Sequence, residues 1–504
     1  MGNGTNIRSI FKTVFSVSSI LLFAKLLGFV KQIIVSNAFG ATIDTDIISL
    51  SQGVITDFEY IISQTMLTAF VPIYIAIKEI GGNERHFVAN VLKIFVIVSI
   101  IISTLIFAFA PLISKILAPS YQGDVAESLV YNVRIYAFSL VILTLIAIYN
   151  ALLKANKIFL PGEIISVNQS LAFIICVLMF GSTLGVEALI ISFFVYIFIN
   201  ILYLGAFSKK YWSLNIRGFE LDDNIRKLLK MIAPLLFGYA MLYINQLVDK
   251  ILASGIGDGA VTAMGYSAVL TNFVTGFIGS ICGIAFTYIA QNVAGKSDEM
   301  AASIVEYFIV FFVTFLIPIS IISTVNAREI VSVVFGRGAF DANAVEYSTY
   351  ALMGYGFVFI PYVLRELFTR LQYSYHDSKQ PMINSTISIV CNIVLSIIFS
   401  RFWGILGITV ASSISVLVCA ILNILASRKY NRHLKISSFN KQFMFWLAGG
   451  TICLGINLIL RDYLNISNVF LRFVVLSFLT FASYGIVVSP IIISTIKERN
   501  MFVR

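Results

Sequence analysis

Two lysines in a long apolar stretch near the N-terminus need a chemical explanation. Lys25 and Lys31 are six residues apart, so on a helix their side chains project about 120° apart, along one broad wall. An ammonium group inside a bilayer is costly unless it meets water, a partner or an anionic ligand. Lysines that line a hydrated cavity are suited to binding a phosphate or diphosphate. The structural alternative for Lys31 is that its amine reaches an interface.

Further polar residues interrupt other apolar stretches. Asp57 and Glu59 lie in one of them, and Asn245, Asp249 and Lys250 lie in another, with Asn245 and Asp249 one helical turn apart. Such residues tend to face a cavity or one another, so the structural alternative is that they fix helix packing. We expect them to surround a hydrated cavity. The predicted substrate-binding residues are Lys25, Lys31, Lys250, Asp46 and Asp249.

Motifs of soluble enzymes are weak. The triplet Asp44-Thr45-Asp46 has the form that holds a divalent metal in some glycosyltransferases, but a turn in a very short loop explains it as well. No phosphate-cradling glycine loop of nucleotide hydrolases is present, and the three histidines all fall on or near predicted inside loops. The five cysteines lack CxxC spacing, so we expect neither a disulfide framework nor a metal site. We predict no cofactor and no direct use of ATP.

The composition defines the elements that must position these residues. The 504 residues are 59% hydrophobic and 12% charged, whereas soluble proteins are about 45–50% apolar and about 25% charged. This excludes a water-soluble enzyme and a disordered chain. We predict an all-α polytopic membrane protein of about fourteen helices, centred near residues 24, 62, 102, 140, 172, 196, 240, 276, 313, 358, 392, 415, 452 and 481.

The basic residues predict the orientation of these spans. With a cytoplasmic N-terminus, 24 of the 35 lysines and arginines fall in inside segments, Arg370 among them, and 6 fall in outside loops. This bias satisfies the positive-inside rule and predicts that both termini are cytoplasmic. The net charge of +10 is then topological, and we expect no nucleic-acid partner. The first apolar run continues past Lys31, so we interpret it as a retained helix and not a signal peptide.

A faint repeat divides the chain. Pro161 and Pro381 are 220 residues apart, and Gly185 and Gly404 are 219 apart, as expected of a duplicated six-helix unit. The predicted domains are an N-terminal lobe (1–207), a cytoplasmic linker (208–230), a C-terminal lobe (231–430), and a final pair of helices with the tail (431–504).

The order of several motifs resembles one known family. The stretch from Ala24 to Lys31, the Ala38-Phe39-Gly40-Ala41 segment with Asp46, and Ala69-Phe70-Val71-Pro72 are similar to the MurJ (MviN) family of lipid-linked precursor flippases. Later matches are Gly336-Arg337-Gly338-Ala339-Phe340-Asp341, then Arg370, Tyr373, Tyr375, Asp377, Lys379 and Pro381. The resemblance covers most of the first twelve predicted helices. It implies fourteen helices, two lobes and inward-to-outward flipping of an undecaprenyl-diphosphate-linked sugar.

The chain also departs from that family's pattern. Lys25, Lys31 and Gln32 stand where the family has an arginine-rich motif, so the charge is retained but the bidentate fork is lost. The family's arginines in helices 2 and 8 fall near Glu59 and on Val269. Peptidoglycan lipid II and another polyprenyl-linked glycan, such as an O-antigen, capsule or teichoic-type unit, therefore both remain candidate substrates.

The sequence leaves three functions to be weighed for this membrane protein. The first is a monomeric flippase of the bacterial cytoplasmic membrane that moves a polyprenyl-diphosphate-linked glycan across the bilayer. The alternative is a cation-coupled multidrug exporter of the same superfamily, for which Asp57, Glu59 and Asp249 would supply acidic groups. An embedded glycosyltransferase is disfavoured because no large polar loop could hold a catalytic site, so we predict that the chain is not an enzyme. The sequence leaves Na⁺, H⁺ and the membrane potential open as driving forces.

Overall fold

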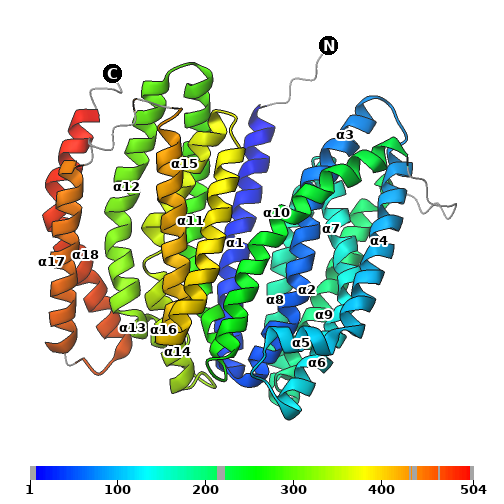
Figure 1. The fold of residues 1–504 in the computed structure, drawn as a ribbon, viewed down its shortest axis with the longest axis horizontal. Helices are drawn as coiled ribbons and strands as arrows, with labels where there is room; N and C mark the ends of the chain where they lie inside the picture. The colour runs from blue at the N-terminus through cyan, green and yellow to red at the C-terminus, as the bar shows by residue number, and fades with distance from the viewer. Residues whose placement is uncertain (1–6, 213–221, 431–432, 434–439, 464–465, 500–504) are drawn as a thin grey trace. The chain divides into compact units, whose positions relative to one another are not determined.

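Every regular element in the described parts of the chain is helical (Figure 1). The computed structural model describes residues 7–212, 222–430, 433, 440–463 and 466–499. Backbone N–H and C=O groups find no partners in lipid, so apolar segments that cross a bilayer satisfy them internally as helices. The predicted all-α membrane fold is confirmed.

The chain divides into two compact units. The first contains the residues up to Thr262 together with Gly338–Phe340, and the second contains Ala263–Arg337 and Asp341–Arg504. The first unit holds α1 (Ile7–Phe39), α2 (Ile43–Thr65), the π-helical turn η1 (Met66–Phe70), α3 (Val71–Glu79), α4 (Glu84–Ala108), α5 (Ala110–Leu117), α6 (Gly123–Ala137), α7 (Ser139–Ala155), α8 (Leu160–Leu184), α9 (Glu187–Ser208), η2 (Lys209–Tyr211) and α10 (Asp223–Ser254). The second holds nearly all of α11 (Ala260–Ala294), then α12 (Asp298–Val325), α13 (Ala327–Val334), α14 (Ala342–Tyr355), α15 (Phe359–Ser374), α16 (Lys379–Ser427), α17 (Asn440–Tyr463) and α18 (Val469–Arg499).

The number of membrane spans agrees with the predicted fourteen. Among the described residues, twelve helices are long and apolar enough to cross a membrane, and the pair α14 and α15, bent by 44°, makes a thirteenth. The 49 residues of α16 would extend about 70 Å as one helix, more than twice the ~30 Å hydrocarbon core. Gly404 interrupts α16 with a φ of 56°, so its two halves count as separate spans.

The order of helices recurs along the chain. A short break divides α4 from α5 and α6 from α7, and the same breaks divide α12 from α13 and α14 from α15. Gly185 follows α8 with a φ of 58°, and Gly404 joins the two halves of α16 with a φ of 56°. These glycines are 219 residues apart in the sequence. The same left-handed backbone conformation therefore marks equivalent junctions, where a residue with a Cβ would be strained.

The division into units differs from the predicted lobe boundary in one helix. α10, which includes the start of the predicted second lobe (231–430), packs along α2 and belongs to the first unit. Contacts from Lys250, Tyr243 and Tyr239 to α2 hold it there. Part of the predicted linker (208–230), at 213–221, lies outside the described residues, and that linker stays a prediction.

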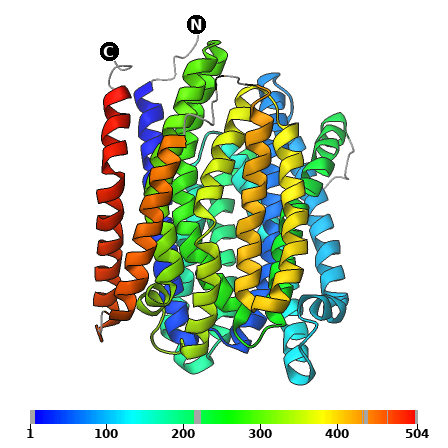
Figure 2. The same cartoon turned by 60° about the vertical axis from the view of Figure 1, so that its left-hand side comes forward.

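The last two helices belong to the second unit. α17 and α18 lie side by side in both views of the ribbon (Figures 1 and 2). The indole N–H of Trp446 on α17 donates to the Thr314 hydroxyl on α12, over 3.0 Å. Cys453 on α17 and Tyr484 and Val488 on α18 join the buried core of the unit, which α11, α12 and α15 also supply.

One span of the first unit contains a wide turn. α2, the π-helical turn η1 and α3 form a continuous helical stretch of 37 residues, Ile43–Glu79. Pro72 lies in the first turn of α3, where it lacks a backbone donor and its ring crowds the carbonyl four residues earlier. A π-helical turn relieves such a conflict at the expense of regular packing.

Replacing Gly259 tests the closeness of the α1–α2 connection to the start of α11. Gly259 has a φ of 80°, and a Cβ there would lie 2.0 Å from the Ala41 carbonyl oxygen. We expect Gly259→Ala to lower the free energy of unfolding by roughly 2–5 kcal/mol, through backbone strain and overlap together. Thermal unfolding of the purified protein in detergent measures this.

Two other glycines supply the controls. Gly185 has a φ of 58° but open space around it, so Gly185→Ala isolates the strain, about 1–2 kcal/mol. Gly265 lies in the helix α11 with open space around it, so Gly265→Ala should not destabilise and should raise the free energy of unfolding by up to about 1 kcal/mol. Equal melting temperatures for the Gly259 and Gly265 variants would contradict the close approach.

Candidate functional site

Asp46 caps a helix. It is fully buried in the first turn of α2, and one of its carboxylate oxygens accepts the backbone N–H of Thr262 over 2.7 Å. The other accepts the N–H of Val261 over 3.4 Å. These amides belong to the first turn of α11, where orphan donors and the helix dipole favour a negative charge. Both carboxylate oxygens of Asp46, a predicted substrate-binding residue, therefore already accept hydrogen bonds from backbone amides.

Lys31 packs against the ring of an aromatic residue. Its ammonium lies 5.0 Å from the centre of the Phe173 ring on α8, and the side chain is half-buried. Phe173 in turn lies 6.3 Å from Tyr196 on α9, measured between ring centres. A cation over an aromatic face is stabilised by the ring quadrupole.

Lys25 has a different environment. The side chain is exposed, six residues before Lys31 on the same helix. The two amines therefore do not converge on one point, because six residues separate them by about 9 Å along the axis and 120° around it. Within the described parts of the chain, neither lysine forms an ion pair.

Lys250 has an acidic partner across a helix interface. Its Nζ lies 3.5 Å from Oδ2 of Asp57 on α2, and the two side chains are 25% and 20% exposed. Gly53, one turn before Asp57, makes room for the amine, because a Cβ there would lie 2.8 Å from Nζ. The neighbouring Asp249 is buried. The pair connects residues 193 positions apart in the sequence.

Tyrosines continue the line of this pair. Tyr60 on α2 lies 5.3 Å from Tyr243 and 6.5 Å from Tyr239, both on α10, measured between ring centres. Tyr60 follows Glu59, which is close enough to Tyr196 to interact electrostatically. The first unit thus holds a cation–aromatic group at Lys31 and, between α2 and α10, the Asp57–Lys250 pair with three tyrosines.

A second charged cluster lies in the second unit, on α15. Arg365 donates to Oε1 of Glu366 over 2.9 Å, and Arg370 donates to Oε2 over 3.1 Å. Arg370 also donates to the Gly279 carbonyl on α11 over 3.4 Å, and the Arg365 guanidinium lies 4.7 Å from the Tyr362 ring centre. Two arginines on one carboxylate leave a net positive charge within a span.

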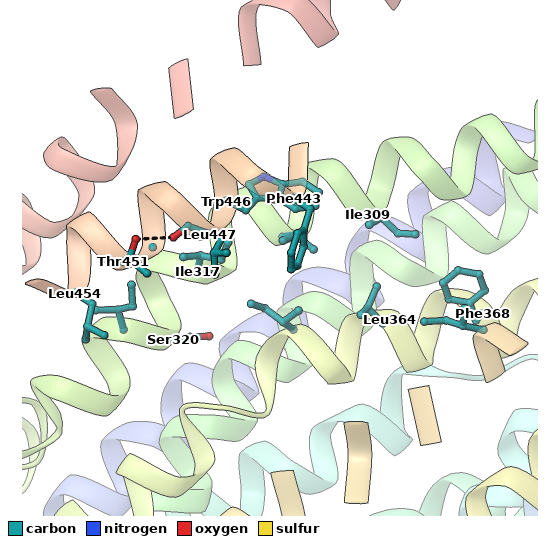
Figure 3. Close-up of a pocket in the computed structure, with 15 residues that line it drawn as sticks. Ile309, Ile317, Ser320, Leu364, Phe368, Phe443, Trp446, Leu447, Thr451 and Leu454 are labelled. Atoms are coloured by element: carbon teal, nitrogen blue, oxygen red, sulfur yellow. Dashed lines mark hydrogen bonds between the residues drawn. The ribbon is translucent and has the colours of Figure 1, made fainter. Parts of the chain in front are cut away.

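An apolar groove lies in the second unit between α12, α15, α16 and α17 (Figure 3). Its volume is about 560 Å³. The Thr451 hydroxyl in its wall donates to the Leu447 carbonyl over 2.9 Å, and Trp446 donates to Thr314. The other labelled lining residues are almost all aliphatic or aromatic, including Ile309, Leu364 and Leu454. The groove matches a hydrocarbon chain and offers little to a polar head.

Comparison with known proteins decides the family. A family model described as Lipid II flippase MurJ matches residues 35–479. The chain belongs to the MurJ family. It is accordingly a multi-pass membrane protein, and the membership agrees with the resemblance identified from its motifs.

Individual members of the MurJ family are distant relatives. A probable lipid II flippase MurJ of Vibrio cholerae is 31% identical over 196 residues, which are 38% of this chain and 37% of that protein. One from Borreliella burgdorferi is 24% identical over 425 residues, 81% of this chain and 82% of that protein.

Solved structures show the shared fold. A lipid II flippase MurJ in an inward closed conformation has a TM-score of 0.78 at 18% identity, covering 96% of this chain and 100% of that one. An inward-facing MATE family multidrug resistance transporter of the MOP superfamily has a TM-score of 0.67 at 15% identity, covering 82% of this chain and 97% of that one.

The MurJ-family signature segments hold helix ends in place. The N–H of Ala339 donates to the Asn37 carbonyl over 2.9 Å. Asp341 accepts the N–H of Ala344 over 2.8 Å and so caps α14. These residues position the connections between helices.

The signature residue Asp377 does the same for α16. Its Oδ1 accepts the N–H groups of Lys379 and Gln380, over 2.9 and 3.1 Å, and its Oδ2 accepts the Tyr430 hydroxyl. This hydroxyl, followed by the amide of Gln380, holds the pKa of the Asp377 carboxyl below its usual value.

The predicted site residues of this MurJ-family chain have different surroundings in the structure. Asp46 caps the start of α11 and Lys250 is paired, whereas Lys25 and Lys31 have no acidic partner among the residues that the structure describes. Arg365 and Glu366 form an ion pair. Sequence reasoning missed the contribution of Arg370, which was counted with an inside loop but lies on α15. The spacing of Glu366 and Arg370, one helical turn, was the available signal.

Replacing Asp46 should release the start of α11. We expect Asp46→Ala to lower the free energy of unfolding by about 1–2 kcal/mol, the usual value for a lost helix cap. Thermal unfolding in detergent measures the change. Asp44, exposed in the same first turn, provides the matched control Asp44→Ala, and an equal effect of both substitutions would refute the capping role.

Glu366→Gln should destabilise the second unit. The change leaves two guanidinium groups with a neutral partner, and because the three side chains are 20–31% exposed we expect a loss of only about 1–2 kcal/mol. The exposed Glu346 on α14 provides the control Glu346→Gln. Unchanged unfolding of the Glu366 variant in low salt would show that the cluster contributes nothing to stability.

Proposed function

We propose that this chain moves an undecaprenyl-diphosphate-linked glycan precursor, lipid II or another cell-surface polysaccharide unit, from the inner to the outer leaflet by alternating access. The observation that carries the proposal is the match of residues 35–479 to the lipid II flippase MurJ family. The chain binds and moves its substrate, and no catalytic step is part of the proposal.

The unpaired lysines of α1 support binding of an anionic head. Lys25 and Lys31 have no acidic partner among the described residues, so the cost of placing them in a span is offset when a diphosphate arrives. Lys250 contributes a third cation once the diphosphate competes with Asp57 for it. Lysines act here as point charges and do not impose the bidentate geometry of arginine.

The polyprenyl chain requires an apolar surface while the head crosses. The groove between α12, α15, α16 and α17 (Figure 3) offers aliphatic and aromatic walls over about 560 Å³. The rest of the chain stays among the lipids, which are equally apolar.

The charge asymmetry of the loops supports the direction. With 24 basic residues in predicted inside segments and 6 in outside loops, both termini lie in the cytoplasm of a bacterial cell. The membrane potential acts on a net positive carrier with about 2.3 kcal/mol per charge per 100 mV. Glu59 and Asp249 remain candidates for coupling Na⁺ or H⁺, and the transporter works as a monomer.

Two acidic residues of the first unit are already engaged, which counts against a multidrug exporter. A carrier of hydrophobic cations needs available carboxylates. Asp46 is committed to backbone amides, and Asp57 is paired with Lys250.

Lysine substitutions test the function. In a bacterium depleted of its own flippase, Lys25→Ala combined with Lys31→Ala should abolish complementation while the protein still inserts, because the diphosphate loses both unpaired cations. Arginine at both positions should restore growth, and Lys115→Ala, exposed on α5, should be neutral. Growth is measured with membrane abundance of each variant.

Lipid mass spectrometry on the purified protein provides the second measurement. Polyprenyl-diphosphate species should be retained by the unaltered chain and lost from the double variant. Normal growth of the double variant would remove these lysines from the site. Efflux of a cationic dye that Asp249→Asn abolishes would favour the exporter instead.

A further inference from the structure

Three tyrosines of the first unit form a cluster that neither ion pairing nor the hydrophobic core explains. Tyr60 on α2 lies 5.3 Å from Tyr243 and 6.5 Å from Tyr239 on α10, measured between ring centres. The Tyr60 side chain is 42% exposed. Aromatic residues that only hold helices together bury their rings, as Tyr136 and Phe193 do elsewhere in this unit.

The tyrosines lie on the same face of α10 as Lys250. Tyr243 and Tyr239 precede it by seven and eleven residues, and both spacings return to within about 20° of the same direction on a helix. The seven-residue step places Tyr243 about 10 Å along the axis from Lys250.

Contacts with α2 and the following turn η1 have a matching order. Lys250 meets Asp57, Tyr243 meets Tyr60, and Tyr239 meets Thr68, whose hydroxyl is 3.5 Å from the Tyr239 hydroxyl. The two helices therefore run antiparallel, and the tyrosines extend the line that begins at the ion pair.

Polar groups accompany the rings along this line. Gln246, exposed between Tyr243 and Lys250, is on the same side of α10. Glu59 precedes Tyr60 and is close enough to it to interact electrostatically. Polar side chains within spanning helices face water or a polar ligand and avoid acyl chains.

An apolar pocket of about 390 Å³ borders the line. It lies between α2, α4, α5 and α10, and its walls include Phe58, Ile61 and Ile244. Tyr243 and Asp57 line it as well. Tyr243 thus lies at the boundary between polar groups and an apolar pocket, a position that suits an aromatic ring with a hydroxyl.

This combination matches the chemistry of a sugar ring. A pyranose has an apolar face of C–H groups, which packs on an aromatic ring, and a rim of hydroxyls, which pair with phenol, amide and hydroxyl groups. A diphosphate near Lys250 would place the first sugar one to two helical turns further along α10, at Tyr243 and Tyr60.

We propose that Tyr60, Tyr239 and Tyr243 form the subsite that binds the pyranose rings of the transported glycan. The proposal rests on the proposed function and adds to it a site for the sugars, distinct from the lysines that hold the diphosphate. It also gives these residues a role in distinguishing a glycan-bearing lipid from its bare carrier.

Binding of two lipids by the full-length chain in nanodiscs tests this subsite. The probes are undecaprenyl diphosphate and the same lipid with a linked disaccharide that carries no peptide, and native mass spectrometry measures the affinity for each. We expect the unaltered chain to prefer the disaccharide lipid by about tenfold, the equivalent of one well-placed aromatic contact. Tyr60→Leu and Tyr243→Leu should each abolish this preference and leave the affinity for undecaprenyl diphosphate unchanged.

Two controls separate stacking from folding. Phenylalanine at position 60 or 243 keeps the ring and should retain most of the preference. Tyr131 on α6 is 65% exposed and outside the cluster, so Tyr131→Leu should change neither affinity. Retained binding of undecaprenyl diphosphate shows that the leucine variants are folded.

The outcomes distinguish the two proposals. Equal loss of both lipids in the leucine variants, no loss of either, or equal affinities in the unaltered chain would each overturn the sugar subsite. If the unaltered chain bound neither lipid, the flippase function itself would fail.

Discussion

The bilayer is the solvent on which the rest of this structure depends. Because lipid offers no hydrogen bonds, the backbone is helical throughout the described spans, and each polar side chain inside them needs a specific reason to be there. Asp46 is stabilised by the start of α11, Asp57 and Lys250 by each other, and Glu366 by two arginines. The α1 lysines stand apart from this pattern, since the described residues offer them no counter-charge.

The same constraint explains how much of the fold could be predicted from the sequence. The spans were predictable because a membrane helix must be long and apolar, and the break within α16 because Gly404 repeats the position of Gly185. The grouping of α10 with the first unit was not predictable. This grouping depends on contacts such as that between Tyr243 and Tyr60. They join residues far apart in the chain, and the hydropathy of the sequence does not reveal them.

The candidate site shows where sequence reasoning ends. The type and placement of Lys25, Lys31 and Lys250 pointed to anion chemistry, but only the structure distinguishes the paired lysine from the unpaired ones. Asp46 was named as a binding residue and belongs to a segment that resembles the family, but the structure engages its carboxylate with backbone amides at the start of α11. Arg370 was assigned to a loop because helix ends are the least certain boundaries. Several residues that mark the MurJ family, Asp341 and Asp377 among them, likewise secure helix starts.

The wide turn at Met66–Phe70 has a consequence for the helix that carries Asp57 and Tyr60. A π-helical turn holds one more residue than an α-helical turn, so the stretch Val71–Glu79 is rotated by about 100° relative to an uninterrupted rod. The part of the rod that faces the ion pair and the tyrosines is thereby uncoupled from the part whose Tyr74 packs beside Phe70. The extra residue therefore sets the direction of the side chains on α3 independently of those on α2.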